Sequence, residues 1–207
     1  MGLRHAIVLI SAICMLTLIA AGFWWQDWQY SFATERPAGL VQPAAGQAVS
    51  LAALKLPPSD TKKPILLHFF NPDCPCSKFN LDHVRELARR FGGQVRFVAV
   101  VQGEANMSRF KKLGLPMEAV TDADSKIGLD MGVYSTPQAV LIDAQGRLYF
   151  RGNYNKSRYC KEANTEYARI AIEALLEGKA SVAVDPEAGV AYGCPRKAVD
   201  LKANSPT

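Results

Sequence analysis

The chain has 207 residues, 49% hydrophobic and 21% charged, which allows one membrane segment and one compact domain of ordinary size but not a second large domain. The formal net charge is +5, yet the lysines and arginines are scattered and no basic block alternates with aromatic residues, so no nucleic-acid partner is expected. The five cysteines are therefore the main candidates for chemistry.

The N-terminal residues 1–25 are predicted to form a membrane anchor. From Ala6 to Trp25 the sequence carries no charge over about 20 residues, the length that spans the hydrocarbon core of a bilayer. A cleaved signal peptide is the alternative. Its apolar core is usually only about 7–15 residues long, but the small residues 20–22 could form a cleavage site.

The flanks of this segment predict its orientation. Arg4 precedes the apolar run, and positive charge favours the cytoplasmic side of a membrane. Aromatic residues, which favour the membrane interface, gather at the other end: Trp24, Trp25, Trp28 and Tyr30. We therefore expect a cytoplasmic N-terminus and a soluble part outside the cytoplasm. Cys14 lies inside the apolar run and is expected to pack as a small apolar residue.

A linker is predicted over residues 26–62. This segment is rich in Ala, Gly, Gln and Pro and contains at most a short ordered piece around residues 49–54. The folded domain is then expected over residues 63–180, followed by a C-terminal tail over residues 181–207 that contains Cys194.

The first part of the domain predicts a strand, a helix and a second strand. Residues 64–70 form a nearly continuous apolar run, which is typical of a strand buried on both faces. Residues 76–91 have helical spacing and end at two glycines, and residues 95–101 form the next strand. This order predicts parallel pairing with a right-handed crossover.

The later elements complete an α/β domain with a mixed sheet. Short elements are predicted over 106–113 (helix), 118–121 (strand) and 125–131 (helix). Two strands, residues 136–143 and 147–152, are separated by a turn and predict an antiparallel hairpin. A closing helix is predicted over residues 166–177.

The cysteines at 74 and 76 lie where the first strand gives way to a helix. Cys74 should therefore lie at the helix N-terminus, where unpaired backbone N–H groups lower the pKa of a thiol and make it nucleophilic. The neighbouring Asp73 opposes part of this effect.

The chain here resembles the thioredoxin-like superfamily over residues 64–178. The resemblance rests on the strand, the cysteine turn and helix, and the later Thr136-Pro137 that enters a strand. It implies a central mixed β-sheet flanked by helices, with Pro137 cis and facing the cysteine turn and the backbone beside Thr136 pairing with a bound substrate segment. The segments 74–77, 152–160 and 192–194 are also similar to a group of bacterial membrane-anchored, redoxin-type proteins.

This resemblance assigns roles to the residues of the Cys-Pro-Cys-Ser turn. Cys74 matches the nucleophile, and Ser77 stands where the family has its second cysteine, so the usual resolving thiol is missing. Cys76, Cys160 and Cys194 are the candidate replacements. We favour Cys76, in a tight Cys-x-Cys ring, because this choice requires no tertiary assumption.

Cys160 and Cys194 are candidates for a disulfide of their own. Exported domains commonly use such bridges, and this one would attach the C-terminal tail to the domain. A resolving role for either cysteine is the alternative.

The preferred hypothesis is a membrane-anchored, extracytoplasmic thiol-disulfide oxidoreductase that needs no cofactor. Its expected partners are protein thiols or disulfides, or a membrane redox partner, and the resemblance places it in a bacterial inner membrane with its domain in the periplasm. One alternative is a copper-binding module with Cys74 and Cys76 as ligands and His83, or else His68, as the third ligand. The other is an interaction module that has kept the fold without the chemistry.

Overall fold

The structure is a computed structural model that describes residues 2–28, 32–56, 63–156, 160 and 162–196. It divides into two compact units, Met1–Ala33 and Thr34–Thr207, which are described separately. Tyr30, residues 57–62 of the predicted linker, Arg158 and Tyr159 of the resemblance segment, and residues 197–207 of the predicted tail lie outside the described residues.

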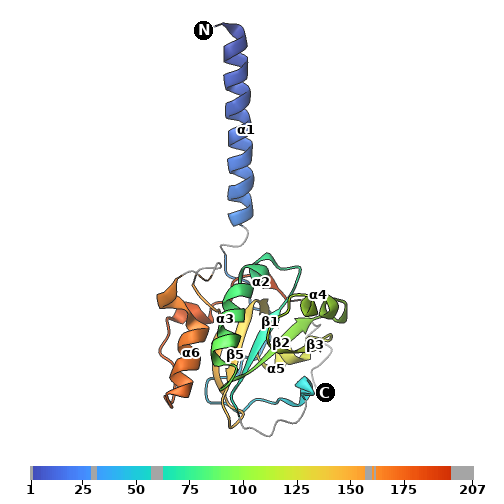
Figure 1. The fold of residues 1–207 in the computed structure, drawn as a ribbon, viewed down its shortest axis with the longest axis vertical. Helices are drawn as coiled ribbons and strands as arrows, with labels where there is room; N and C mark the ends of the chain where they lie inside the picture. The colour runs from blue at the N-terminus through green and yellow to red at the C-terminus, as the bar shows by residue number, and fades with distance from the viewer. Residues whose placement is uncertain (1, 29–31, 57–62, 157–159, 161, 197–207) are drawn as a thin grey trace. The chain divides into compact units, whose positions relative to one another are not determined.

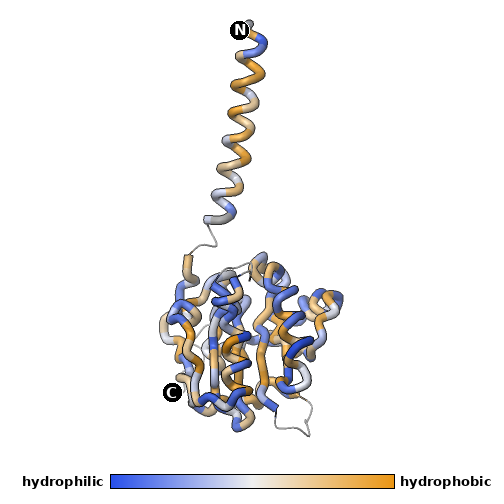
Figure 2. Tube along the Cα trace, turned by 60° about the vertical axis from the view of Figure 1, so that its left-hand side comes forward, coloured by the Kyte–Doolittle hydropathy of each residue, from blue (hydrophilic) through white to orange (hydrophobic). Residues whose placement is uncertain are grey.

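The described residues of the first unit include helix α1 (Leu3–Trp28). Its segment Leu3–Gln26 is 24 residues long and has the length and composition of a membrane-spanning helix. Figure 2 shows that apolar residues dominate almost the whole length of α1 rather than one face of it. Such an all-round apolar surface is typical of a helix that contacts lipid.

The second unit is built on a five-stranded mixed sheet in the order β3-β2-β1-β5-β6 (Figure 1). The strands are β1 (Ile65–Phe70), β2 (Arg96–Gln102), β3 (Glu118–Asp122), β5 (Gln138–Ile142) and β6 (Leu148–Gly152). β1, β2 and β3 are parallel, whereas β5 is antiparallel to both β1 and β6. The predicted strand-helix-strand unit and the predicted hairpin are both present, and the fold is thioredoxin-like.

Helices cover both faces of this sheet. They are α2 (Pro75–Phe79), α3 (Leu81–Phe91), α4 (Met107–Lys111), α5 (Lys126–Asp130) and α6 (Tyr167–Leu176), with short 3-10 turns η1 (Ala52–Leu54), η2 (Glu104–Asn106), η3 (Ala163–Thr165) and η4 (Pro186–Gly189). The single helix predicted over 76–91 is two helices, because the chain turns tightly at Asn80, whose backbone N–H donates to the carbonyls of both Cys76 and Lys78. The Asn80 side chain is buried.

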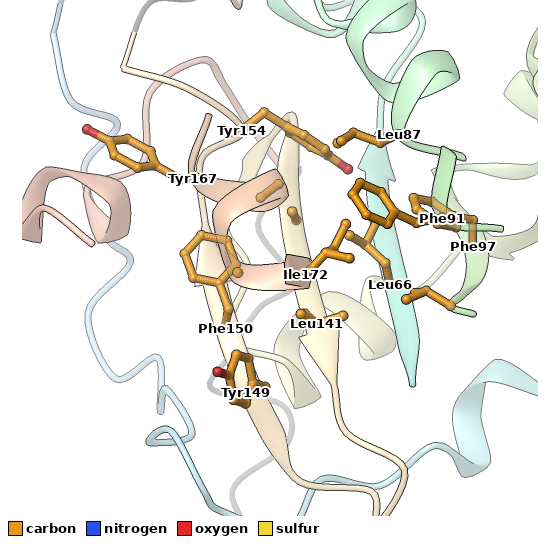
Figure 3. Close-up of a cluster of buried hydrophobic side chains, with 14 of the residues drawn as sticks. Leu66, Leu87, Phe91, Phe97, Leu141, Tyr149, Phe150, Tyr154, Tyr167 and Ile172 are labelled. Atoms are coloured by element: carbon orange, nitrogen blue, oxygen red, sulfur yellow. The ribbon is translucent and has the colours of Figure 1, made fainter. Parts of the chain in front are cut away.

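The core has two layers because alternate side chains of β1 point to opposite faces. On one face Leu66 packs with residues of α3 and α6, and Figure 3 shows Leu66, Phe91 and Ile172 meeting there. On the other face Leu67 packs with Ile127 of α5 and with residues of η1.

Residues 34–56, predicted as part of a linker, instead pack along the domain. Leu40 and Leu54 are buried, and the Gly46 N–H donates to the Leu148 carbonyl at 2.7 Å. Backbone pairing needs no apolar side chain, and two buried leucines do not form a periodic pattern. The composition of this segment, rich in Ala, Gly and Pro, therefore did not indicate that it packs on the domain.

A second, two-stranded ladder lies outside the main sheet. It pairs β4 (Ser135–Thr136) antiparallel with β7 (Cys194–Pro195). Since β7 belongs to the C-terminal tail, this ladder brings the tail to the loop that precedes β5.

Candidate active site

A disulfide joins Cys74 to Cys194, which are 120 residues apart in sequence and have Cα atoms 5.8 Å apart. Cys74 is the N-cap residue of α2, at the end of the turn that connects β1 to this helix, and Pro75 occupies the first turn of the helix. Cys194 is the first residue of β7. The site therefore combines the strand-to-helix junction with the C-terminal tail.

This pairing corrects two predictions. Cys194 is bonded to Cys74 and not to Cys160, and Cys76 is not the disulfide partner of Cys74 in this structure. The reason is tertiary: the β4–β7 ladder carries Cys194 to the N-terminus of α2, whereas Cys160 lies against Asn80, where α2 ends and α3 begins.

The loop that contains Thr136 and Pro137 faces the disulfide. The peptide bond between these residues is cis, as the resemblance implies. The Thr136 carbonyl oxygen lies 3.2 Å from the Cys74 sulfur, and both residues are fully buried. In the reduced protein a Cys74 thiol at this position can donate a hydrogen bond to that carbonyl.

Ser77 lies on α2 and is fully buried. Its hydroxyl oxygen accepts a hydrogen bond from the Asn71 backbone N–H at 3.4 Å, so it supports the turn that presents Cys74. A serine cannot form a disulfide. Ser77 therefore supports the turn but does not take part in electron transfer.

An exposed ion pair lies beside the turn. The Asp73 carboxylate pairs with Arg109 of α4, with Nη1 and Oδ1 2.6 Å apart. The guanidinium partly neutralises the negative charge next to Cys74, although an exposed pair of this kind is weak.

Cys160 is in an environment that suppresses its reactivity. Burial, together with the nearby Glu166 carboxylate, raises the pKa of the Cys160 thiol to about 12. The thiol donates to the Asn80 side-chain oxygen at 2.9 Å. Cys160 is therefore protonated at neutral pH, and it is a poor candidate for the resolving thiol.

Cys160 is expected to resist alkylation in the folded, fully reduced protein. With a pKa of about 12, roughly one thiol in ten thousand is ionised at pH 8. Iodoacetamide should therefore modify it at least about a hundredfold more slowly than in the same protein unfolded in urea. Peptide mass spectrometry of timed samples measures both rates, and equal rates would contradict the suppressed reactivity.

The two histidines named as possible copper ligands lie against Tyr154 instead, and only His68 is fully buried. His68 Nδ1 is 2.8 Å from the Tyr154 hydroxyl, and burial lowers the pKa of His68 to about 3. His83 packs edge-on against the Tyr154 ring, and burial lowers its pKa against the opposing effect of Glu166. Among the residues that the structure describes, no three His, Cys, Asp or Glu side chains form a metal-binding group, so His83 is not grouped with the two cysteines of the turn.

Two residues that sequence reasoning missed anchor the tail beside the disulfide. Arg196 forms an ion pair with Asp122, and the two side chains are 3% and 0% exposed. Asp122 is the last residue of β3, at the carboxyl edge of the parallel strands, where ligands of α/β proteins commonly bind. Its position at the end of a strand was the signal in the sequence that could have identified Asp122. Its partner Arg196, however, lies 74 residues away in the sequence.

Comparison with known proteins agrees with this fold. The family model described as "Domain of unknown function (DUF6436)" matches residues 45–195. The protein named "Thiol:disulfide interchange protein DsbE" of Escherichia coli (strain K12) is 30% identical over 90 residues, which are 43% of this chain and 49% of that protein. The Vibrio cholerae protein of the same name is 27% identical over 115 residues, or 54% and 62% of the two chains. The chain thus spans about half the length of the curated relatives it matches.

Two solved structures resemble the chain over most of its length. An uncharacterized conserved protein from Geobacillus kaustophilus has a TM-score of 0.57 and 22% identity, covering 82% of this chain and 93% of that one. A hypothetical protein from Sinorhizobium meliloti 1021 has a TM-score of 0.57 and 23% identity, covering 80% and 94%. At these identities the likeness concerns the fold.

Proposed function

The chain belongs to the family described as "Domain of unknown function (DUF6436)", and from its site we propose that it is a thiol-disulfide oxidoreductase whose redox couple is Cys74 and Cys194. The observation that supports this most directly is the disulfide between a helix N-cap cysteine and a cysteine 120 residues away. The names of the thiol:disulfide interchange relatives are consistent with this activity.

The proposed exchange takes two steps in the reducing direction. The Cys74 thiolate attacks one sulfur of a partner disulfide, forms a mixed disulfide and releases the other partner sulfur as a thiolate, which takes up a proton. The Cys194 thiolate then attacks the Cys74 sulfur, forms the bond between Cys74 and Cys194, and releases the second partner thiol. Two electrons pass from the protein dithiol to the partner, and the reverse sequence oxidises a partner dithiol.

Cys194 is the best of the three candidate resolving thiols. It is bonded to Cys74 in the structure, whereas the high pKa of Cys160 leaves that thiol protonated. Cys76 is buried in the first turn of α2 and lies outside the disulfide. The proposed couple is therefore a disulfide between two residues that are distant in sequence, and not the predicted Cys-x-Cys ring.

The proposed partners are protein thiols and disulfides, or a membrane redox partner, and the proposed location is a bacterial inner membrane. The apolar helix α1 supports anchoring, and Arg4 supports a cytoplasmic N-terminus with the second unit in the periplasm. An oxidising compartment is also where a disulfide persists.

A redox titration of the full chain in detergent tests the couple. After equilibration at a series of glutathione poises, the thiols are alkylated and the disulfides mapped by mass spectrometry. We expect the bond between Cys74 and Cys194 to open as one two-electron transition. A Cys74 that pairs with Cys76 instead, or that stays unreactive at every poise, would contradict the proposed couple.

A further inference from the structure

The segment Gly193–Arg196, called the tail strand below, is bound like an extended peptide. It pairs antiparallel with β4, with Thr136 opposite Cys194 and Ser135 opposite Pro195. Beyond the ladder, the backbone N–H of Arg196 donates to the Tyr134 carbonyl at 2.9 Å. Main-chain bonds of this kind hold a peptide without regard to its side chains, and pockets at particular positions supply the selectivity.

The position before the cysteine admits glycine alone in this register. Gly193 has φ +127°, and a Cβ atom there would lie 2.3 Å from the Thr136 carbonyl oxygen. That oxygen belongs to the backbone of the loop facing the disulfide, so it cannot easily move aside. Any larger residue would displace the strand from β4.

The position two residues after the cysteine has a pocket for a guanidinium group. Arg196 Nη2 lies 2.5 Å from Asp122 Oδ2, and the guanidinium packs over the Phe69 ring at 5.1 Å. Asp122 is itself fixed by the backbone N–H groups of Ile127 and Gly128 at 2.9 and 3.0 Å.

The shape of this pocket also depends on a glycine. A Cβ atom on Gly128 would lie 2.8 Å from Arg196 Nε, so a side chain there would obstruct the guanidinium. A buried carboxylate and an aromatic face therefore meet at one position, and together they favour a cationic side chain.

Cys74 is fully buried while the tail strand is in place. No partner sulfur can reach it until the tail strand leaves, and departure exposes the edge of β4 and leaves the carboxylate of Asp122 without its cation. Both changes are unfavourable unless another segment pairs with β4 and supplies a cation to Asp122. A segment with the same residues as the tail strand at these positions fits best.

We propose that the tail strand is a built-in copy of the substrate, and that the site binds an extended partner segment with glycine before its cysteine and arginine two residues after it. This inference rests on the proposed function. The partner cysteine bonds to Cys74, and its arginine occupies the Asp122 pocket. Tail and partner cannot occupy β4 together, so the attack by Cys194 that resolves the mixed disulfide also displaces the partner segment from the strand.

Model peptides test this specificity on the full chain in detergent, with Cys194→Ser so that Cys74 is available. The probe is the hexapeptide Ala-Tyr-Gly-Cys-Pro-Arg, which copies residues 191–196, as a mixed disulfide with thionitrobenzoate. Attack by Cys74 on the peptide sulfur releases the coloured aryl thiolate, the better leaving group. Controls are the same peptide with glutamate for arginine or alanine for glycine, and the Cys74→Ser/Cys194→Ser protein measures background.

The arginine peptide should react at least about tenfold faster than either control peptide. Asp122→Asn should reduce the rate ratio of the arginine peptide to the glutamate peptide to within about twofold, while the preference for glycine over alanine should remain. Arg196→Ala, which weakens the competing tail, should raise the rate with the arginine peptide. Equal rates for all three peptides at a reactive Cys74 would overturn the recognition while leaving the proposed function intact. A Cys74 that reacts with no peptide and with no small aryl disulfide would overturn the proposed function, and the recognition with it.

Discussion

Replacing Cys194 by serine is expected to stop repeated turnover of disulfide exchange while leaving a single covalent capture at Cys74. Without the second thiol, the mixed disulfide between Cys74 and a partner has no internal attacker and persists. We expect the steady-state rate with a protein disulfide substrate to fall at least about a hundredfold, with one equivalent of trapped partner per chain. Non-reducing electrophoresis and mass spectrometry measure the trapped species.

Matched variants separate this result from a general effect of cysteine removal. Cys76→Ser and Cys160→Ser each remove a thiol that lies outside the disulfide, so both proteins should retain turnover within a few fold of the unsubstituted chain. Loss of turnover in Cys76→Ser together with normal turnover in Cys194→Ser would support Cys74 and Cys76 as the redox couple and rule out the couple of Cys74 and Cys194.

Acid is expected to destabilise the domain through His68. Burial lowers the pKa of His68 from 6.5 to about 3, so the folded protein holds this imidazole neutral. The unfolded chain binds the additional proton, and the stability from this residue is therefore complete above about pH 6.5 and is lost as the pH falls toward 3. From pH 7 to 4.5 the expected loss is about 3 kcal/mol. Denaturant unfolding of the full chain, fully oxidised in detergent, measures it.

His68→Asn is the matched control for this acid sensitivity. An asparagine amide can occupy the place of Nδ1 next to the Tyr154 hydroxyl but does not titrate, so the variant should be less stable at pH 7 and lose less stability on acidification. Carboxylates that pair with cations contribute equally in both proteins, so the difference between the two pH profiles isolates His68. Parallel pH profiles of the two proteins would show that the pKa of His68 is not lowered in the folded protein.

Local patterns in the sequence were sufficient to predict the elements that build the sheet. The apolar run at 64–70, the helical spacing after the cysteine turn, and the hairpin at 136–152 each depend on contacts within a short stretch of chain. The position of Cys74 at a strand-to-helix junction follows from two adjacent elements. These features can be predicted from the sequence because the periodicity of their residues, or the elements adjacent in sequence, determine them.

The partner of Cys74 could be decided only by the tertiary structure. Four cysteines outside the apolar segment allow several pairings, and spacing in sequence favoured Cys76 because it is two residues away. The β4–β7 ladder and the ion pair of Asp122 with Arg196 instead bring in a cysteine 120 residues away. Such long-range pairings leave no periodic trace in the chain. The sequence by itself therefore determined where Cys74 lies, and the fold determined which cysteine is bonded to it.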